Sequence, residues 1–219
     1  MIENTSRDKI KELRAKTGAG ISDCKKALEA AEGQINLAID SLRKQGLASA
    51  DKKLGRIAAE GIIESYIHSS KIGVLVELNC ETDYVARNSK FKELAKNIAM
   101  QIAASNNIQY VALTDIPQSV VDYEVSIESN KEDLINKPDS VKEKILNGRL
   151  EKRLNELTLM SQPFIKDTSI SVETLIKDAV SQLGENIKIR RFEKFILGEG
   201  LEKKDNDFAN EVANMIKSK

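Results

Sequence analysis

The spacing of apolar residues in the first fifty positions predicts three short helices. In the second of them, apolar residues recur at i, i+3, i+4 and i+7, the spacing that places side chains on one helical face. The third helix repeats this spacing and ends at Gly46, and the first ends at the turn of residues 17–20. Helices this short do not persist alone in water, so the three are expected to pack together. The residues of the second stripe are Cys24, Ala27, Leu28 and Ala31.

The pattern then changes from helical to alternating. Residues 61–68 and 72–80 read as two strands joined by a short polar turn at 69–71, an antiparallel hairpin. A long helix follows Glu81, and Thr82 or Asp83 is placed to cap its first turn. Its apolar stripe at helical spacing consists of Phe91, Leu94, Ala95, Ile98 and Ile102.

The remaining chain predicts further helices and one more strand. The strand covers residues 186–197 and is expected to join the hairpin in one sheet, since a hairpin alone is only marginally stable. The fold class is therefore α+β: a three-helix module (1–46), a helical linker (47–60), a core with a small antiparallel sheet flanked by helices (61–200) and a short C-terminal helical module (201–219). The helices of the later core are predicted near residues 118–128, 140–159 and 171–183.

Composition and charge exclude several classes of protein. The 219 residues carry 34 Lys and Arg against 34 Asp and Glu, a formal net charge of zero. A general nucleic-acid binder is expected to be basic, so this balance argues against one. No apolar run is long enough to span a membrane. The charged N-terminus lacks the features of a signal or transit peptide, which favours a cytoplasmic protein.

The residues available for chemistry argue against an enzyme. His68 is the only histidine, there is no tryptophan, and Cys24 and Cys80 match no zinc-binding spacing. The phosphate-binding, dinucleotide-binding, zinc-protease and hydrolase motifs are all missing. We therefore expect neither a cofactor nor a metal site, and the sequence favours helices that bind another protein.

Four ordered motifs resemble one known family. They are LRAKTGAGISDCKKAL at 13–28, ELNCETDYVARN at 77–88, the segments SQPF, GENI and RRF between 161 and 192, and DFA at 207–209. Together they resemble bacterial translation elongation factor Ts, in a short-core form similar to cyanobacterial and plastid members. Two departures stand out: Tyr84 replaces the usual phenylalanine, and Ile21-Ser22 replaces a pair of methionines.

The resemblance implies a guanine-nucleotide exchange factor that binds elongation factor Tu and promotes GDP release. It implies that Thr82, Asp83, Tyr84 and Val85 intrude beside the Mg²⁺ site of that GTPase. An exchange factor needs only differential affinity for two states, so the lack of catalytic motifs fits this reading. The alternative from pattern alone is that Asp83 caps the helix and Tyr84 packs against it as a hydrophobic staple.

In the N-terminal module, which the resemblance makes UBA-like, Arg14, Ile21 and Ser22 match family positions that touch the GTPase. The alternatives are a solvated Arg14, a core Ile21 and a Ser22 that serves only as a helix N-cap.

The resemblance also bears on assembly and compartment. Short members dimerise, some through a cysteine in the last strand, but Glu193 stands at that position here. A dimer held by packing alone and a monomer both fit this departure, and both bacterial cytoplasm and plastid stroma fit the sequence. The alternative function is a ribosome- or RNA-associated protein that reads nucleic-acid backbone through Lys188, Arg190 and Lys194, although alternation makes these residues a solvated sheet face.

Overall fold

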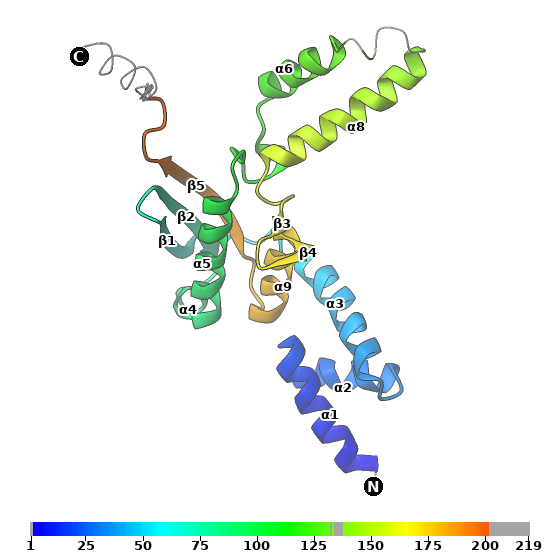
Figure 1. Cartoon of the computed structure of the whole chain (residues 1–219). Helices are drawn as coiled ribbons and strands as arrows, with labels where there is room; N and C mark the ends of the chain where they lie inside the picture. Colours follow the sequence, from blue (N-terminus) through cyan, green and yellow to red (C-terminus); the bar gives the residue numbers. More distant parts are fainter. Residues whose placement is uncertain (1, 132, 134–137, 202–219) are drawn as a thin grey trace, which may run out of the picture.

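The structure, a computed structural model, describes residues 2–131, 133 and 138–201 and confirms the α+β class (Figure 1). The helix and the module predicted after residue 201 lie outside these residues. The elements are α1 (Ile2–Thr17), α2 (Ile21–Ala30), α3 (Ile35–Asp51), β1 (Glu60–His68), β2 (Ile72–Cys80), α4 (Asp83–Arg87), α5 (Ser89–Ala104), the 3-10 turn η1 (Leu113–Asp115), α6 (Gln118–Ser129), α8 (Asp139–Leu157), β3 (Pro163–Phe164), β4 (Asp167–Ser171), α9 (Val172–Leu183) and β5 (Lys188–Ile196).

The first three helices pack together, as predicted, around a small apolar core of their own. This core includes Leu13, Cys24 and Leu28. The predicted end of the third helix at Gly46 is wrong, because α3 continues to Asp51. A Cβ atom on Gly46 would lie 2.7 Å from Oγ of Ser181 in α9. This glycine therefore permits close packing of α3 against α9 rather than ending the helix.

The sheet has three antiparallel strands in the order β1-β2-β5, so the predicted hairpin and third strand are confirmed. The hairpin register pairs His68 with Ile72 at the turn and Glu60 with Cys80 at the open end. Alternate residues of the central strand are buried, as the alternation predicted: Val74, Val76, Leu78 and Cys80.

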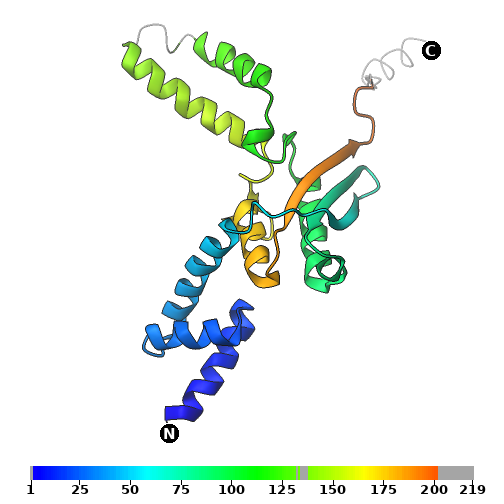
Figure 2. The ribbon, with the colours of Figure 1, turned by 180° about the vertical axis from the view of Figure 1, so that it is seen from behind.

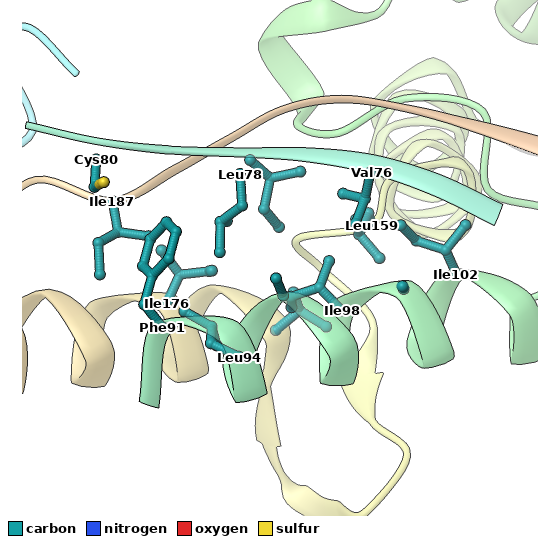
Figure 3. Packing of buried hydrophobic residues seen from close by; sticks show 14 of the residues in the cluster. Val76, Leu78, Cys80, Phe91, Leu94, Ile98, Ile102, Leu159, Ile176 and Ile187 are labelled. Carbon is teal, nitrogen blue, oxygen red and sulfur yellow. The ribbon is translucent and has the colours of Figure 1, made fainter. Parts of the chain in front are cut away.

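The main core lies between this buried sheet face and the helices α5 and α9 (Figure 3). The single helix predicted after Glu81 is divided into α4 and α5 at Asn88. The backbone of Asn88 is extended (φ −64°, ψ 136°), and its side chain accepts a hydrogen bond from the Lys90 N–H at 2.9 Å. Asn88 therefore starts a second helix, and the short α4 becomes an element with its own orientation.

A β-bulge changes which basic side chains of β5 share a face. Leu78 pairs with Ile189 but Glu77 pairs with Arg191, so one residue of β5 is extra. The prediction that Lys188, Arg190 and Lys194 lie together on a solvated face is therefore wrong. The ammonium group of Lys194 points toward α5, where it donates to the carbonyl oxygens of Ala103 and Ser105.

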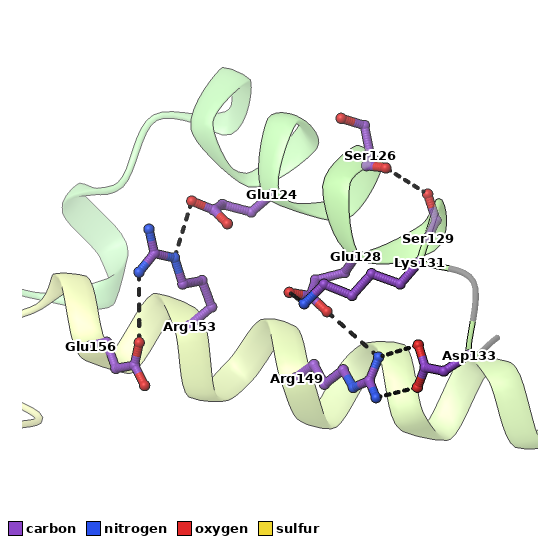
Figure 4. A network of polar contacts seen from close by, with 9 residues as sticks. All are labelled: Glu124, Ser126, Glu128, Ser129, Lys131, Asp133, Arg149, Arg153 and Glu156. Carbon is purple, nitrogen blue, oxygen red and sulfur yellow. Dashed lines mark hydrogen bonds and ion pairs between the residues drawn. The ribbon is translucent and has the colours of Figure 1, made fainter.

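The helices α6 and α8 form a hairpin that projects from the body at the end opposite the N-terminal module (Figures 1 and 2). The two buried residues of α6 are both glutamates. Glu124 accepts from Nε of Arg153 at 3.2 Å, and Lys131 donates to Glu128 at 2.6 Å (Figure 4). This hairpin is thus closed largely by charged pairs.

Candidate functional site: an exposed edge at the start of α4

The motif at 77–88 forms the end of β2, a two-residue connection and all of α4. The side chain of Thr82 caps α4 by accepting a hydrogen bond from the Val85 N–H at 3.4 Å. The prediction that Thr82 or Asp83 caps this helix is thus confirmed for Thr82. Asp83 instead accepts from the Arg87 guanidinium at 2.8 Å, an exposed ion pair one turn apart.

Tyr84 projects into solvent from the first turn of α4. Its side chain is 79% exposed, so the alternative of a packed hydrophobic staple is wrong. Val85 and Ala86, the next two residues, are buried in the main core. An exposed ring on a helix fixed by its neighbours is suited to insertion into a partner, because little conformational entropy remains to be lost.

Val85 differs from the other three residues of its motif. It is only 4% exposed, so the direct contact with a partner expected for its side chain is not available in this structure. Thr82, Asp83 and Tyr84 are exposed. We therefore place Val85 beneath the edge as a packing residue, and we define the α4 edge as Thr82, Asp83 and Tyr84.

Sequence reasoning missed Glu185, which lies beside the α4 edge although it is 103 positions from Thr82 in the chain. Its carboxylate accepts hydrogen bonds from the backbone N–H groups of Glu81 and Thr82, at 3.1 and 3.0 Å. It also accepts from the Thr82 hydroxyl at 2.6 Å. Its position directly after a glycine that ends a helix was the available signal, but the sequence does not show which loop it faces.

Cys80 lies under the same edge and is not a reactive thiol. Its Sγ donates to the carbonyl oxygen of Thr82 at 3.1 Å. Burial, with a smaller contribution from the charge of Glu185, raises the pKa of this thiol to about 11. Since the thiolate is the nucleophile, Cys80 is inert at neutral pH. This agrees with its place on the buried face of β2.

The second group of candidate residues lies on the N-terminal module. Arg14 is exposed on α1, and Ile21 is 58% exposed at the start of α2, so the core alternative for Ile21 is wrong. Ser22 is exposed in the first turn, and the N-cap position belongs to Gly20, which makes no side-chain cap. The capping alternative for Ser22 is therefore also wrong.

The side of the sheet turned away from the core carries a cluster of exposed apolar residues. Register places Phe195 opposite Gly73 and Glu193 opposite Leu75. Beside the cluster, Glu77 accepts from Arg191 at 2.7 Å and from Arg190 at 3.2 Å. The two guanidinium groups, Arg191 foremost, hold the pKa of the Glu77 carboxyl below its usual value. We call the four apolar residues of the cluster the outer sheet face. They are Ile63, Ile67, Leu75 and Phe195, which are 70%, 71%, 46% and 64% exposed.

The described residues show neither of two other kinds of site. No group of three or more His, Cys, Asp or Glu side chains in the described part of the chain is arranged to hold a metal ion. Within the same residues, no helix has both the length and the apolar character needed to cross a membrane. The exposed aromatic ring at the start of α4 and the exposed apolar residues of the sheet are features typical of surfaces that bind other proteins.

Comparison with known proteins identifies the class of binder. The family model described as "Elongation factor TS" matches residues 21–199, most of the chain. The chain is 58% identical to chloroplastic elongation factor Ts of Rhodomonas salina over 99% of this chain and all of that protein. It is 60% identical to elongation factor Ts of a Picosynechococcus strain, over 93% of this chain and 94% of that protein. It is 56% identical to elongation factor Ts of a Prochlorococcus marinus strain, over 98% of this chain and 99% of that protein.

The chain therefore belongs to the elongation factor Ts family, and the predicted resemblance to cyanobacterial and plastid members is confirmed. Its role is that of a nucleotide exchange factor in translation elongation.

Proposed function

We propose that this chain binds elongation factor Tu in its GDP-bound state and accelerates GDP release by disturbing the Mg²⁺ site with the α4 edge. Mg²⁺ bridges phosphate oxygens to the protein in GTPases, so displacing its ligands weakens the hold on the nucleotide. GTP can then bind the emptied site. The observation that carries the proposal is Tyr84, a 79% exposed ring held by a helix whose next residues are buried.

The proposal needs no catalytic group. An exchange factor changes the nucleotide affinity of its partner by binding the nucleotide-free state more tightly than the bound state. Asp83 adds a carboxylate near the ion, where it can compete for or repel the groups that hold Mg²⁺. In this account the chain is not an enzyme and holds no cofactor of its own.

The N-terminal module supplies a second contact in this account. Arg14, Ile21 and Ser22 are all exposed and lie on α1 and at the start of α2. We assign them to a contact with the GTPase domain of elongation factor Tu. Two separate contacts on one factor raise its affinity without a large continuous interface, because the second contact forms within the complex already made.

Stopped-flow release of a fluorescent GDP from elongation factor Tu tests the proposal. Tyr84→Ala is expected to lower the maximal release rate by roughly thirtyfold, as for an aromatic hot spot at an interface. The matched control is Tyr123→Ala, which removes another exposed tyrosine (64%) from α6. No acceleration by the wild-type chain would refute the exchange function. Acceleration equal in wild type and Tyr84→Ala would refute the role of the ring alone.

We further propose that two chains form a homodimer through the outer sheet face, giving a complex with two copies of each protein. Exposed apolar clusters on one sheet face are typical of interfaces, and a two-fold axis would pair the same residues on both copies. Glu193, where some short members carry a cysteine, is exposed on this face, so packing rather than a disulfide would hold the dimer. Sedimentation velocity of Phe195→Asp should show monomers, while Ile127→Asp on α6 should sediment as wild type.

The alternative function, binding of RNA backbone, has weaker support. Its three basic residues do not form a strip, because Lys194 binds the end of α5 and Arg190 pairs with Glu77. RNA binding would show a steep loss of affinity with salt, whereas the exchange account expects no measurable affinity for RNA at physiological salt. The compartment we propose is bacterial cytoplasm or plastid stroma, where relatives of both kinds work.

A further inference from the structure

We propose that Glu185 is a positioning residue for the α4 edge, fixing Thr82 and therefore the direction of the Tyr84 ring. This inference rests on the proposed exchange function and assigns it a residue from a distant loop. Glu185 uses both carboxylate oxygens on this one segment: one accepts from two backbone N–H groups, and the other accepts from the Thr82 hydroxyl at 2.6 Å. Hydrogen bonds to a charged acceptor are about twice as strong as neutral ones.

Thr82 carries this constraint into the helix. The same Oγ1 that donates to Glu185 accepts from the Val85 N–H. The hydroxyl therefore links the carboxylate to the first turn of α4, which carries Tyr84. A helix of five residues has too few internal hydrogen bonds to fix its own orientation, so its N-terminal contacts and its buried residues must do so.

The loop that carries Glu185 is itself held in return. Gly184 ends α9 in the left-handed region (φ +80°), a conformation that a side chain would strain. The backbone N–H of Asn186, the residue after Glu185, donates to the Glu81 carboxylate at 2.6 Å. Glu81 and Glu185 thus each accept hydrogen bonds from the other's segment, which fixes the two loops to one another.

Asn186 extends the network to the segment between α3 and β1. Its side chain is 3% exposed, and its Nδ2 donates to the carbonyl oxygens of Leu54 and Arg56, at 3.3 and 2.7 Å. Three stretches of chain therefore meet beneath the α4 edge: residues 54–56, 81–82 and 185–186. The Asn186 amide at the centre of this network is buried and its donors are used, so it holds the three stretches together beneath the exposed Thr82.

The test measures the maximal rate and the half-saturating concentration in the GDP-release assay. Glu185→Ala is expected to lower the maximal rate by about tenfold, the loss of a charge-assisted hydrogen bond, with a much smaller change in half-saturation. Glu185→Gln can still accept from both N–H groups and donate to Thr82, so it should keep the rate within about threefold of wild type. The matched control for charge is Glu151→Gln, an exposed glutamate on α8.

A double-mutant cycle separates positioning from general stability. In the Tyr84→Ala background, Glu185→Ala should lower the rate by less than about twofold, because the ring it positions is gone. Should Glu185→Ala fail to fold, Thr82→Val tests the same link from the other side, because it removes the hydroxyl that donates to Glu185. It should lower the rate to a similar extent, and a Thr82→Val rate equal to wild type would overturn the inference.

Two results with the Glu185 variants overturn the inference while the exchange function stands. One is a Glu185→Ala rate equal to wild type in a chain whose Tyr84→Ala variant is impaired. The other is Glu185→Gln as impaired as Glu185→Ala, which would assign the effect to charge rather than to position. A wild-type chain that does not accelerate release overturns the exchange function itself, so the two failures are distinguishable.

Discussion

The main core and the α6–α8 hairpin are stabilised in different ways. The core between the sheet, α5 and α9 buries large apolar side chains completely, Phe91, Leu78, Ile98 and Ile102 among them (Figure 3). In the described part of the hairpin, Leu157 at the base of α8 is the one apolar residue that is buried. Its buried positions on α6 hold carboxylates paired with Arg149, Arg153 and Lys131 (Figure 4).

The difference indicates where the molecule needs rigidity. Apolar burial is not screened by salt as ion pairs are. It also tolerates no rearrangement without loss of packing, and the α4 edge lies on that part of the molecule. Ion pairs near the surface contribute little and are screened by salt. One oxygen of Glu128 is buried without a hydrogen bond and lies 3.9 Å from Arg149. We therefore expect the core to unfold as one unit and the hairpin to open at lower cost.

The largest expected effect is on the core. Phe91→Ala should lower the free energy of unfolding by about 3 to 5 kcal/mol, because the ring is fully buried and its loss leaves a cavity. Urea denaturation measures this. Val141→Ala, a 42% exposed apolar residue of the hairpin, serves as the contrast and should stay within about 0.5 kcal/mol of wild type. Comparable losses at the two positions would erase the distinction between the regions.

A pH titration tests the burial of Cys80. Its pKa is raised from 9.0 to about 11 in the folded chain, so the unfolded chain loses its thiol proton first as the pH rises. Stability is then unaffected below pH 9 and falls between pH 9 and 11, by about 2 kcal/mol at the upper end. Cys80→Ala should remove this part of the pH dependence. An identical alkaline profile in the variant would contradict a buried, neutral thiol.

The hairpin prediction concerns local opening. Arg149→Ala removes a cation that contacts Glu128 and Asp133. Because the Glu128 carboxylate is buried, its lost compensation costs more than an exposed ion pair would, and the opening free energy of α6 should fall by about 1 to 2 kcal/mol. Native-state hydrogen exchange reports this directly, and amides of α5 should be unchanged. The control is Lys152→Ala, which changes an exposed residue of α8, the helix that also carries Arg149. Faster exchange in α5 as well as α6 would show that the two regions are coupled.

Many buried residues of the main core could be predicted from the sequence, because the spacing of apolar residues indicates which face of a helix or strand is buried. The stripe from Phe91 to Ile102 and the alternation from Ile72 to Cys80 both pack as expected. The errors came from tertiary contacts: Gly46 accommodates Ser181 instead of ending a helix, and a bulge in β5 turns Lys194 toward α5. No local pattern shows either.

For the candidate site, the sequence located the segment but not its environment. Thr82 as a cap follows from residue type, and the exposure of Tyr84 agrees with the family motif. The burial of Val85 depends on how α4 packs against the sheet. The sequence predicted one continuous helix here, so the separate orientation of α4 was not foreseen. Glu185 was missed because its contact with Thr82 spans 103 positions.

If the α4 edge releases GDP by disturbing Mg²⁺, the acceleration must depend on the Mg²⁺ concentration, and this dependence is the first property to measure. The rate would be measured with and without saturating wild-type chain, at millimolar Mg²⁺ and after chelation. The account predicts that chelation speeds spontaneous release and lowers the fold-acceleration by at least about tenfold, because part of the step is already complete. A fold-acceleration that is unchanged by chelation would contradict it.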